Sequence, residues 1–214
     1  MKKVLLPAFM FVFVIFSLPL SLQAAPRNND IRKGLNFTSQ LGMLYGGGIQ
    51  FVESGNYTMD MQDGISYLLN LRLGYRVAKN LSAHLLISGD ASSMLTSQPE
   101  YDSPIDGKYS VTGALGWMAG LGATYYIPVV DVSVSATIGA GNLAFVTDSQ
   151  FYMSETGLST QAQLVKEFWQ GGAHSWGIGV IYKNTDAKFT EKNKYLKASV
   201  NGEYMGLMLT YSFF

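Results

Sequence analysis

The feature that most constrains this chain is an alternation in which apolar residues recur at every second position. Between residues 65 and 77 the odd positions are all apolar or aromatic, while the even positions hold Ser, Leu, Asn, Gly and two Arg. The same period of two returns over residues 109–127 and 130–138. Because successive side chains point to opposite faces of a strand, each segment predicts a β-strand with one apolar face and one small or polar face.

Eight such strands are predicted. They cover residues 35–50, 63–77, 81–92, 108–127, 130–146, 155–169, 175–185 and 199–213. Their connections alternate between short turns and the longer polar segments 52–62, 93–107, 147–154 and 186–198. The glycine run 46–48 predicts a bulge or bend near the end of the first strand. The pattern indicates an all-β fold, an antiparallel up-and-down β-barrel of about eight strands over residues 35–214.

The same period would suit a soluble barrel with its apolar face inside, so the direction of the faces must be argued separately. The non-apolar faces are rich in Gly, Ser, Ala and Thr, which fit the narrow interior of an eight-stranded barrel. Aromatic residues stand near the predicted strand ends, as in membrane-interface girdles: Tyr75, Tyr109, Tyr125, Tyr126, Trp169, Trp176, Tyr182, Tyr211 and Phe213. The sequence therefore predicts a transmembrane barrel in which Leu71, Trp117 and Val134 face lipid.

The N-terminus predicts export. Lys2 and Lys3 precede an apolar stretch at 4–16, and the small residues within 17–25 suit cleavage after Ala24 or Ala25. An uncleaved membrane anchor is the alternative. We expect a signal peptide at 1–25, a short N-terminal segment at 26–34 and the barrel at 35–214.

Composition narrows the classes of function. Charged residues make up 14% of the chain, against about 25% in an average soluble domain. The formal net charge is zero and no basic stripe is present, which argues against a nucleic-acid partner. The chain has no Cys, so disulfides, thiol nucleophiles and Cys-ligated metals are excluded.

The last predicted strand carries a resemblance. Leu207, Leu209, Tyr211 and Phe213 alternate with more polar positions, and one further residue, Phe214, follows. This resembles the C-terminal signal of bacterial outer-membrane proteins, except that Phe213 takes the register of their final aromatic residue and Phe214 is one residue extra. Segments 166–169 and 176–180 also resemble hairpins of small outer-membrane barrels of the OmpX and OmpW type.

The resemblance implies the cell outer membrane of a Gram-negative bacterium. It also implies contact with the barrel-assembly machinery through the C-terminal strand. It assigns no activity.

Several ionisable side chains fall on the inward faces. Arg72, Arg76, His84 and Glu167 are predicted to form a luminal polar network, and Asp90, Gln161 and Gln163 share the same faces. The network could line a pore or a site. A packed interior of paired charges is favoured, because eight strands enclose little more than their own side chains. We expect Arg76 and Glu167, near the periplasmic ends of their strands, to join one network with Arg72.

No catalytic, cofactor or metal site is predicted. His84 shares its face with Ser82 and Asp90, but residues two apart on one strand rarely build a Ser–His–acid triad, so a structural histidine is favoured. Outer-membrane lipid A deacylases of the PagL type carry a His-x-Ser-Asn pattern. His174 and Ser175, at a predicted periplasmic turn, do not reproduce it.

Three functions remain open. The leading hypothesis is a non-enzymatic outer-membrane barrel with a structural or surface-interaction role through its external loops. The alternatives are a narrow channel for small or hydrophobic molecules and a lipid A-modifying enzyme. Expected partners are outer-membrane lipids and lipopolysaccharide, whose phosphates the basic run 188–197 could contact. One chain closes the barrel, so we expect a monomer.

Overall fold

The computed structural model describes residues 34–45, 49–53, 58–61, 65–93, 111–147, 151–169, 174–190 and 197–214. The predicted signal peptide, residues 1–25, lies outside these ranges, as does all but the last residue of the 26–34 segment. Within the described ranges no helix is long and apolar enough to cross a membrane.

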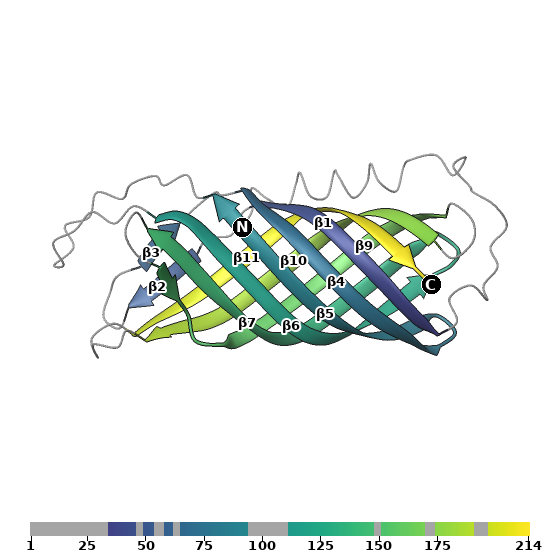
Figure 1. The fold of residues 1–214 in the computed structure, drawn as a ribbon, viewed down its shortest axis with the longest axis horizontal. Helices are drawn as coiled ribbons and strands as arrows, with labels where there is room; N and C mark the ends of the chain where they lie inside the picture. Colours follow the sequence, from purple (N-terminus) through teal and green to yellow (C-terminus); the bar gives the residue numbers. More distant parts are fainter. Residues whose placement is uncertain are drawn as a thin grey trace.

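The described strands form one antiparallel sheet that closes on itself (Figure 1). They are β1 (Leu35–Tyr45), β2 (Ile49–Glu53), β3 (Thr58–Met61), β4 (Ile65–Ala78), β5 (Leu81–Ser93), β6 (Val111–Ile127), β7 (Val132–Thr147), β8 (Phe151–Met153), β9 (Gly157–Trp169), β10 (His174–Thr190) and β11 (Lys197–Phe213). Eight of them follow one another around a ring, β1–β4–β5–β6–β7–β9–β10–β11, and β11 pairs with β1 to close it. The predicted up-and-down barrel is confirmed.

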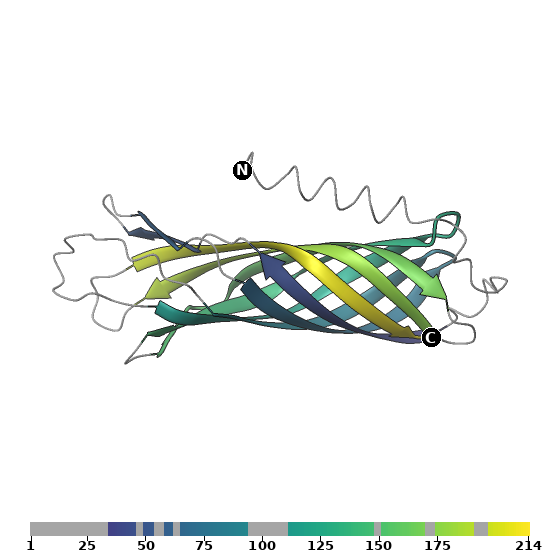
Figure 2. The same cartoon turned by 90° about the horizontal axis from the view of Figure 1, so that it is seen from above.

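The register around the ring determines how far the strands tilt. A path that follows the paired residues from strand to strand leaves β1 at Leu35 and passes Tyr75 on β4 and Ala83 on β5. It then crosses the remaining strands and returns to β1 at Tyr45. The return point is ten residues further along the same strand. For eight strands this stagger corresponds to a tilt of about 40° and an interior that side chains can fill. The inclined strands are plain in Figure 2.

Apolar side chains face outward and polar side chains face inward, as predicted for a membrane barrel. Leu71, Trp117 and Val134 face outward and are 40%, 44% and 42% exposed, while Arg72 and Ser135 beside them face inward and are buried. An exterior of this kind suits hydrocarbon, and ring closure leaves no strand edge of the barrel that lipid would have to solvate.

Aromatic side chains form a girdle at the end of the barrel where β11 ends. Its exposed members are Phe37, Tyr75, Tyr125, Trp176 and Phe213. Tyr211 joins them, with its ring 4.8 Å from that of Trp176 and 5.7 Å from that of His174. Toward the other end Tyr45, Tyr67 and Trp117 are exposed. Two aromatic levels with an aliphatic band between them match the two interfaces of a bilayer.

Tyr126 does not belong to this girdle, and its assignment from the sequence was wrong. It is buried inside the barrel, where its hydroxyl donates to Asp131 Oδ1 at 2.6 Å. Neighbouring residues on a strand point to opposite faces, so Tyr125 and Tyr126 cannot both face lipid. Tyr109 lies outside the described residues.

The two ends of the barrel differ. The short turns at 79–80 and 128–131 lie at the end that holds the C-terminus, and the strand ends that the longer connections join lie at the opposite end (Figure 1). Short turns are periplasmic and long loops external in barrels of this architecture. Strand β7 begins at Val132 rather than at the predicted residue 130, because Asp131 adopts a positive φ of 50° in the turn.

The outer end contains more sheet than predicted. Strands β10 and β11 stay paired up to Thr190 and Lys197, across much of the predicted loop 186–198. After β1 ends, β2 continues along β11 and β3 pairs with β2 in the predicted loop 52–62, while β8 pairs with β7 in the predicted loop 147–154. The predicted bulge or bend at the glycine run 46–48 lies outside the described residues; on either side of it Tyr45 pairs with Met205 and Ile49 with Gly202.

A charge on the lipid-facing surface is expected to cost more midway along a strand than near its end. Leu71→Arg, midway along β4, should reduce the free energy of unfolding by about 2–4 kcal/mol, and Val77→Arg, next to the periplasmic turn, by about 0–1 kcal/mol. Urea unfolding in lipid vesicles measures both values. Equal losses for the two variants would contradict the membrane position assigned to β4.

Candidate functional site

The periplasmic half of the interior is organised around one cation. Arg72 on β4 reaches across to β9, four strands away in the ring, where it donates through Nη2 to Gln163 Oε1. Its Nη1 donates at 3.1 Å to both Thr124 Oγ1 and Ser135 Oγ. The side-chain amides of Gln40 and Gln163 donate to each other at 3.0 and 2.9 Å. A buried guanidinium is thereby held mainly by neutral oxygen acceptors from three other strands.

His84 belongs to the same network. Its Nε2 lies 2.8 Å from Thr137 Oγ1, and its Nδ1 lies 3.1 Å from Thr124 Oγ1. Thr124 thus joins the imidazole to Arg72. In the register Gly122 stands between His84 and Thr137, on the strand that separates them. Because Gly122 has no side chain, the imidazole can lie over it and reach Thr137.

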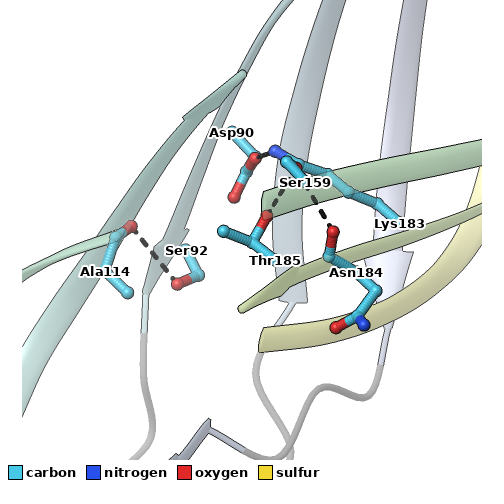
Figure 3. A network of polar contacts seen from close by, with 7 residues as sticks. All are labelled: Asp90, Ser92, Ala114, Ser159, Lys183, Asn184 and Thr185. Carbon is cyan, nitrogen blue, oxygen red and sulfur yellow. Dashed lines mark hydrogen bonds and ion pairs between the residues drawn. The ribbon is translucent and has the colours of Figure 1, made fainter. Parts of the chain in front are cut away.

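A second charged group crosses the external half of the interior (Figure 3). Lys183 on β10 forms an ion pair with Asp90 on β5, and these two strands also stand opposite each other in the ring. Lys183 is 1% exposed. Beside it Ser159 donates to the carbonyl of Asn184 at 3.2 Å and lies 2.7 Å from Thr185 Oγ1. Both charged groups are removed from water, so their direct contact must compensate for the lost hydration, which it does only when the two groups are close and well oriented.

Apolar side chains complete the filling. One buried cluster comes from β1, β4, β9, β10 and β11, and its members are Leu44, Leu68, Val165, Ile181, Tyr204 and Met208. At the periplasmic end a polar cavity of about 40 Å³ remains, room for a few water molecules. Arg72 and Gln40 line it, together with Glu167 and the last residue, Phe214.

The structure brings three of the four predicted network residues to this cavity. Arg72, His84 and Glu167 all line it, and Arg72 experiences the negative charge of Glu167. Glu167 is buried and accepts a hydrogen bond from Ser175 Oγ at 3.4 Å. Arg76 lies at the periplasmic turn, where its Nε donates to the carbonyl of Ala78 at 3.1 Å and its Nη2 to that of Lys79. The pairing of Arg76 with Glu167 stays a prediction.

The side chains around His84 do not form a catalytic relay. Both of its ring nitrogens are bonded to threonines, and Asp90 is bonded to Lys183. His174 is the first residue of β10, and its Nδ1 lies 2.5 Å from the hydroxyl of Tyr211 in the periplasmic girdle. Among the described residues no three His, Asp or Glu side chains gather in a way that could hold a metal ion.

The sequence reasoning missed Lys183. The alternation contained the necessary signal, since Lys183 has the parity of Gly177 and Gly179, the small residues that face inward on β10. Asp90 was placed on the inner face correctly. Nothing local could identify its partner, because the two residues are 93 positions apart in the chain.

A closed ring with an apolar exterior, aromatic girdles and a polar, filled interior defines a transmembrane β-barrel of the outer-membrane type. More particularly, the chain has the fold of the small eight-stranded barrels of the bacterial cell outer membrane. Neither a protein-family model nor a curated protein matches the sequence.

One solved structure shares the fold at a TM-score of 0.50, and two others are similar at lower scores. Neisserial surface protein A is similar with a TM-score of 0.50 and 12% identity, over 83% of this chain and 96% of that chain. Ail of Yersinia pestis is similar with a TM-score of 0.44 and 15% identity, over 83% of this chain and 99% of that chain. OprG of Pseudomonas aeruginosa is similar with a TM-score of 0.45 and 14% identity, over 85% of this chain and 97% of that chain. At such identities the likeness concerns the fold alone.

The space over Gly122 is expected to be essential for the network. In Gly122→Ala the new Cβ would collide with the carbonyl of Ala136, His84 Nε2 and Thr137 Oγ1, so the variant should lose about 1–3 kcal/mol of unfolding free energy. Gly89→Ala is the matched control, because a Cβ there meets nothing within 4 Å. Its effect should stay within about 0.5 kcal/mol. Urea unfolding compares them, and equal losses would contradict the role of Gly122.

A double-mutant cycle tests the predicted coupling of Arg76 with Glu167. If the two side chains share one network, the losses in Arg76→Gln and Glu167→Gln should deviate from additivity by more than about 0.5 kcal/mol in the double variant. Arg76→Gln combined with Lys188→Gln, at the other end of the barrel, should be additive. Additive losses for Arg76 and Glu167 as well would disprove the coupling.

Proposed function

We propose that this protein is a closed, non-enzymatic outer-membrane barrel with a structural or surface-interaction role, and that in its resting state it conducts no solute. The observation that carries the proposal is the Lys183–Asp90 ion pair, which joins opposite strands through the centre of the lumen. Together with the Arg72 network, it ties both halves of the interior across the barrel.

The small size of the cavity among the described residues supports a closed lumen. The cavity of about 40 Å³ lies at the periplasmic end, and Arg72 and Gln40, which hydrogen-bond to Gln163 on the opposite wall, line it. A narrow eight-stranded barrel filled in this way has little room for a substrate or a hydrated solute. The outer surface is therefore the better candidate for interaction with other molecules.

The outer end offers an extended sheet for such contacts. Beyond the last residue of β1, strands β10, β11, β2 and β3 remain hydrogen-bonded side by side (Figure 1). Lys188 is exposed on this extension. Its ammonium group would lie among the lipopolysaccharide of the outer leaflet, whose phosphates attract cations. Lipopolysaccharide remains the expected partner, and the barrel-assembly machinery the expected partner of β11 during insertion.

The closed state predicts that the protein carries no ionic current across a membrane. The purified, refolded wild-type protein should give no steady single-channel current in a planar lipid bilayer, because the crossing side chains leave no continuous aqueous path. A general porin added afterwards to the same bilayer confirms that the membrane can report channels. Unboiled protein should also migrate faster than boiled protein on a gel, which confirms that the recorded sample is folded.

Two outcomes would overturn the proposal. Steady open-channel currents from the folded wild-type protein would favour the channel alternative. A change in the mass spectrum of lipid A that depends on the protein would favour the lipid-modifying alternative.

A further inference from the structure

We propose that the Lys183–Asp90 pair is the constriction of a latent pathway for water and small inorganic ions, and that its two charges determine which ions pass when it opens. The inference starts from the closed wild-type lumen proposed above. It adds a position for the closure and a selectivity for the opened state.

Polar groups are present on both sides of the pair. On the periplasmic side lie the amides of Gln40 and Gln163, then Arg72 and the cavity that Phe214 borders. Toward the outside, Thr185 follows Lys183 on the same face of β10 and is bonded to Ser159. These groups share the lumen with the buried apolar cluster and form one wall of a route that can carry hydrated ions, provided that the side chains crossing it move aside.

Unpartnered polar atoms adjoin the pair on its periplasmic side. Within the described part of the chain, the Oδ1 of Asn70, the Oγ of Ser88 and both amide atoms of Gln161 are buried without a hydrogen-bond partner. Ser88 precedes Asp90 by two residues on the same face of β5, and it pairs with Asn70 in the register. Gln161 pairs with Lys183.

Buried polar groups in folded proteins are almost always bonded to protein or to water. Three such residues around the base of the ion pair therefore form a natural place for water or an ion. In this arrangement the pair separates a hydrated compartment from the outer half of the barrel.

The local packing explains why the pair itself closes the route. Gly116 on β6 pairs with Asp90 in the register, and a Cβ at Gly116 would lie only 2.5 Å from Asp90 Oδ2. The Asp90 carboxylate therefore occupies the space that a side chain of β6 would otherwise fill. Lys183 reaches this carboxylate from the opposite wall. If the pair is broken, β6 has no side chain at position 116 to take its place.

Removing one member leaves the other as an unpaired charge at the narrowest point. A buried, unpaired charge requires water or a counter-ion, so the lumen around it becomes hydrated. In Lys183→Met the remaining carboxylate attracts cations. In Asp90→Asn the remaining ammonium attracts anions. The two variants should therefore conduct with opposite ion preference, an effect that a purely structural role of the pair does not produce.

Bilayer recordings of the refolded full-length chain under a KCl gradient test the proposal. Both variants should show steady single-channel currents that the wild type lacks, with reversal potentials of opposite sign. Lys79→Met is the matched control, because it removes an exposed lysine at the periplasmic turn, outside the lumen, and it should behave as wild type. The difference in gel mobility between unboiled and boiled protein verifies folding of each variant.

Gly116→Ala provides an independent variant that keeps both charges. Its Cβ should displace Asp90 from Lys183 and raise the current, with weaker selectivity than in the two charge variants. Folded variants that remain as silent as wild type, or that share one sign of selectivity, would overturn this inference. Those outcomes leave the closed-barrel proposal intact, whereas steady current from wild type would overturn the closed-barrel proposal itself.

Discussion

Every other feature of this barrel depends on the closure of the hydrogen-bonded sheet between β1 and β11. In hydrocarbon an unpaired backbone amide or carbonyl has no water to bond, so a sheet is stable there only as a ring. The ring closes with a stagger of ten residues between Leu35 and Tyr45, and this stagger determines the tilt and therefore the width of the interior. The interior that results is narrow enough for side chains from opposite walls to meet.

That width explains the pairing of large polar side chains with glycines. His84 can lie over β6 because residue 122 has no side chain, and Asp90 can do so because residue 116 has none. The long side chains then reach partners on distant strands, as Arg72 reaches Gln163 and Lys183 reaches Asp90. Breaking a buried ion pair typically costs about 3–5 kcal/mol, so the Lys183–Asp90 contact stabilises the filled interior.

The filled interior and the extended outer sheet are the basis of the surface role proposed above. Nothing in the described lumen combines a nucleophile, a base and an acid in bonded order, since His84 is held by two threonines and Asp90 by Lys183. In the proposal above, the same ion pair is also the place where the loss of one side chain converts a filled barrel into a conducting one. The closed-barrel proposal and the latent-pathway proposal thus rest on one contact.

The sequence by itself determined the number of barrel strands, the direction of their faces and the position of most girdle aromatics, because alternation along a strand is a local property. It also placed Arg72, His84 and Glu167 on the inner wall. Only the tertiary structure decided which of them meet, that Lys183 bonds Asp90 from the opposite wall, and that β2 follows β11 beyond the end of β1. These contacts depend on the stagger at closure, a property of the whole ring that no single segment encodes.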